Sequence, residues 1–90
     1  MQWHTDPKPI HPNTSVLTLG GHSDWPIAEV CEVMPGRWYC EVDCHLPAKK
    51  RRNATADSEV QAKRWAWVWA HRNLTRLQAE IALLGTYRWC

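Results

Sequence analysis

The sequence predicts an α+β domain in which a short three-stranded antiparallel sheet, a β-meander, packs against one long C-terminal helix. Two patterns along the chain lead to this fold class. Residues 15–45 contain short apolar runs separated by turn residues, whereas residues 57–85 place apolar side chains at helical spacing. With 90 residues, the chain has the length of a single domain with a small core, since such a domain buries only about 60% of its unfolded surface.

The first 14 residues are expected to form an extended N-terminal arm. Pro7, Pro9 and Pro12 lie within this segment, 1–14, and proline disfavours both helices and central strands. A first strand is predicted over residues 15–19 (SVLTL), because this short apolar run ends at a pair of glycines. The meander therefore starts at residue 15.

A β-hairpin is predicted for residues 27–45, where the runs IAEVCEVM and RWYCEVDCH flank a Pro-Gly turn. If Met34 faces Arg37 across this turn, Cys31 faces Cys40, and the two cysteines are either oxidised or small core residues. Because side chains alternate along a strand, the register also fixes the faces of the hairpin. The core face then comprises Ile27, Glu29, Cys31, Val33, Trp38, Cys40, Val42 and Cys44.

The rest of the chain is predicted to contain a basic linker (46–56), a long helix (57–85) and a C-terminal tail (86–90). Asp57 or Ser58 caps the helix, with Gln61 at the spacing of a capping box, and Gly85 ends it. A helix of this length measures about 40 Å, against about 23 Å for a strand of seven residues. The helix is therefore expected to extend beyond the sheet.

The two sides of the predicted helix differ. One side has the spacing of a core stripe, with Val60, Ala66, Trp67, Ala70, Leu74, Leu77, Ile81 and Leu84. The opposite side is aromatic and basic, with Trp65, Trp69, Arg72 and Arg76. Trp and Arg are the residue types most enriched at interface hot spots, so these four residues are candidates for partner binding. Three occupants remain open for this face: a partner protein, a second copy in a homodimer through the helix, or the N-terminal arm with Trp3 and Ile10.

The charge of the chain is polarised. Residues 1–48 contain two basic and six acidic residues, whereas residues 49–90 contain nine basic and three acidic residues. Six of the basic residues cluster in the linker and at the helix start: Lys49, Lys50, Arg51, Arg52, Lys63 and Arg64. Such charges bind phosphates, and nearby Trp side chains can stack on bases, so the cluster is a candidate nucleic-acid-binding site. The alternative is a solvated charge run.

No cofactor, metal or catalytic site is predicted. Cys40, Cys44 and His45 have the sequence spacing of metal ligands, but in an extended strand the two cysteines lie about 13 Å apart, too far for one zinc ion. The five histidines are scattered, and no serine or cysteine has the spacing of an activated nucleophile. The protein is therefore expected not to be an enzyme.

The sequence also predicts a cytoplasmic protein without membrane contact. The N-terminus has no apolar run of the kind that a signal peptide requires, and no segment approaches the roughly 20 apolar residues of a membrane span. In a reducing compartment the four cysteines are expected to be free thiols.

The hairpin IAEVCEVMPGRWYCEVDC followed by the helix SEVQAKRWAWVWAHRNLTRLQAEIALL resembles the plan of small proteins encoded by phages and prophages, including several anti-CRISPR inhibitors. The resemblance covers residues 15–84 as an architecture and transfers no site residues. It implies a phage-type inhibitor or adaptor that occupies a surface of a host protein or ribonucleoprotein complex. The order of strands, basic linker (AKKRR) and helix is also similar to the later part of a double-stranded-RNA-binding domain. That similarity implies the alternative function, a small nucleic-acid-binding module.

Overall fold

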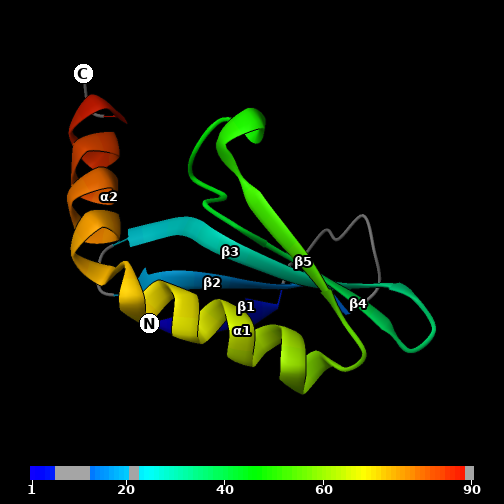
Figure 1. Ribbon diagram of the computed structural model, residues 1–90. Coiled ribbons are helices and arrows are strands. Elements are labelled where there is room, and N and C mark those ends of the chain that lie inside the picture. Colours follow the sequence, from blue (N-terminus) through cyan, green and yellow to red (C-terminus); the bar gives the residue numbers. More distant parts are fainter. Residues whose placement is uncertain (6–12, 21–22, 89–90) are drawn as a thin grey trace.

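The computed structural model of the chain describes residues 1–5, 13–20 and 23–88. Their fold is α+β, with one antiparallel sheet and two α-helices (Figure 1). The strands are β1 (Gln2–Thr5), β2 (Ser15–Gly20), β3 (Ser23–Met34), β4 (Arg37–Val42) and β5 (Arg52–Ala56). The helices are the short 3-10 helix η1 (Ala48–Lys50), α1 (Glu59–Arg72) and α2 (Leu74–Arg88).

The described strands are ordered β1-β2-β3-β4-β5, and each pairs antiparallel with its neighbour in sequence. The predicted meander forms the centre of the sheet, but the predicted limit of three strands is wrong, because each edge has a further strand. β1 lies in the segment predicted as an arm, of which residues 6–12 are outside the described residues. β5 lies in the predicted linker, where RNATA places only small alanines at the apolar positions and so gives a weak strand pattern.

The β3–β4 hairpin has the predicted turn. Pro35 and Gly36 connect the two strands, and Gly36 has a φ of 76°, which glycine adopts without strain. Between Glu32 and Met34, however, the pairing with β4 shifts by one residue. Val33 is the extra residue of a β-bulge, which no residue pattern in the sequence indicated.

The bulge changes which side chains share a face of the sheet. Cys40 faces Val30 instead of Cys31, so the predicted pairing of the two cysteines is wrong. Cys31 and Cys40 point to opposite faces and are free thiols. The predicted core face is wrong along β3 for the same reason, because Ala28 and Val30, rather than Glu29, lie on the side of Cys40.

The core lies between one face of the sheet and the two helices (Figure 1). Its buried side chains are Leu17, Ile27, Ala28, Val30, Trp38, Cys40, Val42, Ala62, Ala66, Ala70, Leu77 and Ile81. Ile27 joins this set through a second irregularity, since the β2 residues Leu17 and Thr18 face Ala28 and Pro26 and leave Ile27 between them.

α1 begins where the sequence predicts. Ser58 Oγ accepts a hydrogen bond of 3.1 Å from the Gln61 backbone N–H, as expected for an N-cap. The prediction that Val60 belongs to the core is wrong, because the helix turns its alanines towards the sheet and leaves Val60 76% exposed. The buried face of α1 consists of Ala62, Ala66 and Ala70, whose small side chains let the helix lie close to the strands.

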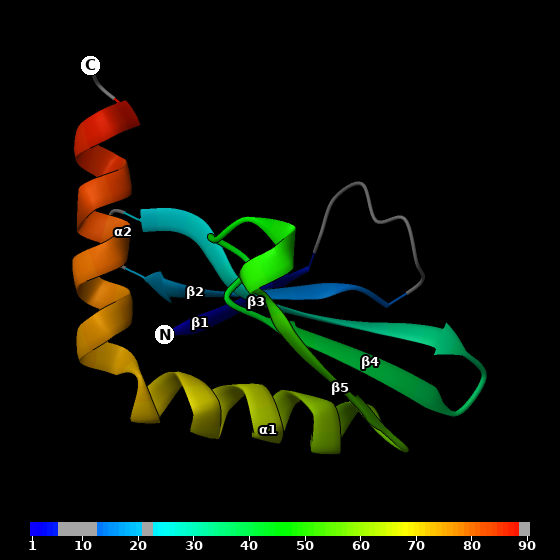
Figure 2. The ribbon, with the colours of Figure 1, turned by 45° about the horizontal axis from the view of Figure 1, so that its top comes forward.

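The prediction of a single long helix is wrong, because the helix bends at Asn73. The Asn73 side-chain amide donates a hydrogen bond of 2.9 Å to the Trp69 carbonyl, and its backbone leaves the helical region at φ −114° and ψ 16°. α2 then runs in a different direction and stands at the end of the sheet where β3 begins (Figure 2). The bend buries Leu77 and Ile81, which a straight helix would carry beyond the sheet.

α2 continues through Gly85 to Arg88, so the predicted helix end at Gly85 and the predicted tail from residue 86 are wrong. A glycine inside a helix weakens it but does not end it when no other residue stops the pattern. Residues 89–90 of the predicted tail are outside the described residues. Neither α-helix of the described chain is long and apolar enough to cross a bilayer.

Candidate functional site

A groove of about 550 Å³ lies at the bend between α1 and α2. Its charged and aromatic lining residues are Asp43, Lys50, Arg52, Trp69, Arg72 and Arg76. Two of these, Lys50 and Arg52, were predicted to bind nucleic acid, whereas Trp69, Arg72 and Arg76 were predicted to bind a partner. The fold therefore combines parts of two predicted sites in one surface.

The sheet register explains why these residues meet. Arg52, the first residue of β5, faces Val42, whose buried side chain lies on the face covered by α1. Arg52 therefore points to that face as well, beside Trp69 near the end of α1. Lys50 reaches the groove from η1, and the bend at Asn73 allows Arg72 to line the same hollow.

Arg76 is held in an ion-pair network. Its guanidinium donates hydrogen bonds of 2.9 Å to Asp43 Oδ1 and of 2.9 Å to Glu80 Oε1, and it lies 5.8 Å from the centre of the Trp69 ring. Burial alone would lower the pKa of Arg76, but the hydrogen bond and charge of Asp43, together with Glu80, raise it. Arg76 stays charged, and its charge is already balanced by the two carboxylates.

Arg76 is exposed, and so are Lys50, Arg52 and Arg72, but these three differ from it in their pairing. None of them forms a salt bridge with the residues that the structure describes. Because the Asp43 carboxylate is paired with Arg76, three uncompensated positive charges face the groove beside Trp69. Such a surface attracts a multiply charged anion, and guanidinium groups bind phosphate oxygens in pairs.

The other predicted basic residues lie elsewhere. Lys49 and Arg64 are exposed but do not line the groove. Arg51 is folded inwards, where it donates hydrogen bonds to the Leu46 and Cys44 carbonyls at 2.8 and 3.0 Å and to Glu41 at 3.2 Å. It fixes the loop before η1 and is not available to a ligand.

Lys63 is also occupied within the chain. Its ammonium group lies 2.8 Å from Glu59 Oε1 and 5.4 Å from the centre of the Trp3 ring. Trp3 therefore packs beside Lys63 at the start of α1 and does not cover the face of Trp65 and Arg72, although cover by the N-terminal arm was one of the three alternatives left open for that face. Ile10, the other residue named for this alternative, is outside the described residues.

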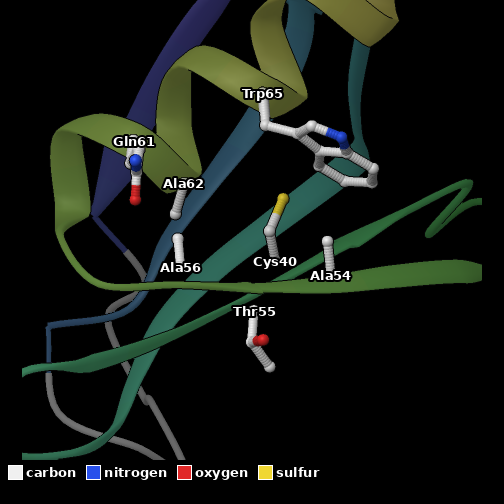
Figure 3. Close-up of a pocket in the computed structure, with 7 residues that line it drawn as sticks. All are labelled: Cys40, Ala54, Thr55, Ala56, Gln61, Ala62 and Trp65. Atoms are coloured by element: carbon white, nitrogen blue, oxygen red, sulfur yellow. The ribbon is translucent and has the colours of Figure 1, made fainter.

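Trp65 belongs to a second, more apolar hollow of about 260 Å³ between β5 and α1. Figure 3 shows its ring reaching over Cys40 and Ala54, with Ala56 and Ala62 at the other end of the hollow. Trp65 is 39% exposed, and Val68 beside it is 40% exposed. These two side chains present an apolar surface next to the edge of the sheet.

One cluster of polar residues was not predicted from the sequence. Asp43, His45 and Glu80 place possible metal-ligand atoms within 4.8 Å of one another, and His45 Nε2 lies 2.7 Å from Glu80 Oε1. Arg76 donates to both carboxylates, so the cluster fits an internal ion-pair network, in which a metal ion would compete with the guanidinium. Asp43 has a positive φ of 61°, a backbone feature that the sequence did not reveal.

Cys40 in β4 and Cys44, two residues after β4, have thiols of low reactivity. Burial, with a smaller effect of neighbouring thiol and carboxylate charges, raises the pKa of Cys40 to about 12. Burial and the Glu41 carboxylate raise the pKa of Cys44 to about 12. Both thiols are therefore protonated at neutral pH, whereas nucleophilic attack and metal binding need the thiolate.

No protein-family model matches the chain, and no curated protein or solved structure matches it significantly. The resemblance to phage-encoded inhibitors therefore stays a prediction.

Proposed function

We propose that the protein is a non-enzymatic binding protein whose groove at the helix bend binds single-stranded nucleic acid. The observation that supports this proposal most strongly is the convergence of Lys50, Arg52 and Arg72, three exposed cations without a salt-bridge partner among the described residues, on one hollow. Polyphosphate chains present negative charges at regular intervals and so match several separate cations better than a single carboxylate does.

Trp69 favours a single strand over a duplex. Its side chain lines the groove together with the cations, and an unpaired base can stack on the part of the ring that Arg76 leaves open, while its phosphates contact the lysine and arginines. In a duplex the base faces are stacked on one another and cannot reach such a ring. Phosphate contacts then supply affinity without strong sequence preference, as in other proteins that bind single strands through a basic groove with stacking aromatic residues.

The experiment compares two charge reversals on the same helix. Arg72→Glu and Arg64→Glu change the net charge equally, and both arginines are exposed, but only Arg72 lines the groove. With a fluorescent oligothymidylate of about 12 nucleotides, Arg72→Glu is expected to raise the dissociation constant by about tenfold or more, and Arg64→Glu much less. Equal effects of the two variants, tighter binding of a duplex of the same length, or no binding at low salt would each overturn the proposal.

A second candidate function is the binding of a protein surface, as an inhibitor or adaptor of a host complex. The observation that favours it is the exposed apolar pair Trp65 and Val68 on α1. An interface centred on these side chains tolerates salt far better than a phosphate-centred one. Binding of a host complex that survives nuclease treatment and high salt, and that is lost in Trp65→Ala, is the expected result for this function.

A further inference from the structure

Among the strands that the structure describes, none pairs with the outer edge of β5. β5 is the last strand of the sheet, and among the described residues its only strand partner is β4. The pairing with β4 is regular over all five residue pairs, without a bulge. An edge strand presents a row of backbone N–H and C=O groups that another strand can bind.

The residues of β5 do little to block such pairing. Proteins protect an exposed edge with charged residues, prolines or bulges, and residues 53–56 of this strand contain none of these. Arg52, the only charged residue of β5, lies at its start. The first residue beyond its end is Asp57, which is exposed and forms no salt bridge within the described part of the chain.

The packing between β5 and α1 also leaves a hollow. Ala54 and Ala56 lie on the face of β5 towards α1 and leave the hollow of about 260 Å³ between the strand and α1, with Trp65 over one end (Figure 3). Trp65 and Val68 remain exposed beside it. A strand added to β5 would bring its own covering helix alongside, and that helix would bury these apolar side chains.

We propose that a second copy of the chain pairs antiparallel with β5 and forms a dimer with one continuous sheet. A two-fold axis at Ala54 pairs β5 with itself over all five residues and places Arg52 of each copy beside the end of β5 in the other, next to Asp57. Unlike charges then lie at neighbouring positions along the paired strands, one pair at each end. A parallel arrangement would place like charges together instead.

The spacing of the layers agrees with this arrangement. In both copies α1 contacts β4 and β5, and the two β4 strands of the dimer would be three strand spacings, or about 14 Å, apart. Helices in direct contact lie about 8–10 Å apart, so the dimer leaves a gap between the two α1 helices. Trp65 and Val68 of both copies would fill this gap and the hollow below it. This inference does not depend on nucleic-acid binding.

The test uses charge complementation at the proposed two-fold axis, with molar mass measured by sedimentation equilibrium. We expect the wild-type chain, of 10.5 kDa, to form a dimer at high concentration. Ala54→Lys and Ala54→Glu should each be monomeric, because each places two like charges opposite one another at the axis, and an equal mixture of the two variants should form the dimer again. Ala79→Lys, the same change at an exposed alanine of α2, should leave the dimer intact.

Several results would overturn the proposal. A wild-type chain that stays monomeric would rule out the dimer, and the edge of β5 could then pair only with a strand of another protein. A dimer that persists in Ala54→Lys, or that the mixture fails to restore from folded variants, would place the interface elsewhere. If the variants do not fold, hydrogen exchange of the wild-type chain decides, since protection of the β5 amides must fall on dilution into the monomer. Protection that is independent of concentration would contradict the interface.

Discussion

Arg76 of α2 and Asp43, directly after β4, are joined by a hydrogen bond of 2.9 Å between Nη2 and Oδ1. Asp43 is only 5% exposed and has a left-handed φ of 61°. The bond holds α2 against the end of the sheet and pairs the Asp43 charge, which lines the groove, with the Arg76 guanidinium. It therefore connects the stability of the helix bend with the electrostatics of the proposed binding site.

Substitutions of Asp43 should destabilise the protein in a defined order. Asp43→Asn keeps an oxygen acceptor and tolerates positive φ, so it is expected to lower the free energy of unfolding by about 1 kcal/mol. Asp43→Ala loses the acceptor and adds the strain of a left-handed alanine, for a total of about 3 kcal/mol. Urea unfolding measures both values. Equal losses in the two variants would show that neither the bond nor the backbone strain matters.

The acid stability of the protein should depend on Glu80. Burial raises the pKa of this carboxyl, but hydrogen bonds from His45 and Arg76 and the charge of Arg76 outweigh burial and leave the pKa below its ordinary value of 4.5. A lowered folded-state pKa stabilises the fold above the ordinary value, and this contribution is lost as pH falls through the folded-state value.

Glu80→Gln is therefore expected to be less stable than the wild-type chain at about pH 7, and the difference should shrink as pH falls below about 4.5. The measurement is urea unfolding of both proteins across this range. A difference that stays constant from neutral pH to about pH 3 would contradict the assignment of the network to Glu80.

The close approach of α1 to the sheet should be sensitive to volume. Ala66 is fully buried against the strands, and Ala66→Leu is expected to lower the free energy of unfolding by about 1–3 kcal/mol through overpacking. The matched control is Ala79→Leu at an exposed position of α2, where the change should be within about 0.5 kcal/mol. Similar stabilities of the two variants in urea unfolding would argue against the tight packing of α1.

Local patterns in the sequence predicted the elements that local chemistry determines. The Pro-Gly turn before Arg37, the strand that starts at Ser15 and the cap at Ser58 all lie where the sequence placed them. The elements that failed depend on tertiary contacts. β5 pairs through its backbone and needs only small side chains such as Ala54 under α1, so its strand pattern is weak. The bend at Asn73 occurs because a straight helix would leave Leu77 without a core to enter.

The candidate site was predicted in parts but not as a whole. Arg72 and Lys50 were assigned to two different sites, because they lie far apart in the sequence and no local pattern shows that the helix bend brings them together. Arg51 and Lys63 were assigned to the nucleic-acid site, but both are occupied by partners that only the fold provides. The number of cations follows from the composition of the chain. Which of them lack a partner and line the groove depends on the register of β5 and on the bend of the helix.

The salt dependence of nucleic-acid affinity tests the central proposal most directly. Each phosphate contact on a single strand contributes about −0.7 to the slope of log affinity against log salt, so contacts from Lys50, Arg52 and Arg72 predict a slope of about −2. Arg72→Ala should reduce this slope by about 0.7, and Arg64→Ala should leave it unchanged. An affinity that is insensitive to salt, or a slope that Arg72→Ala does not change, would contradict phosphate binding in the groove.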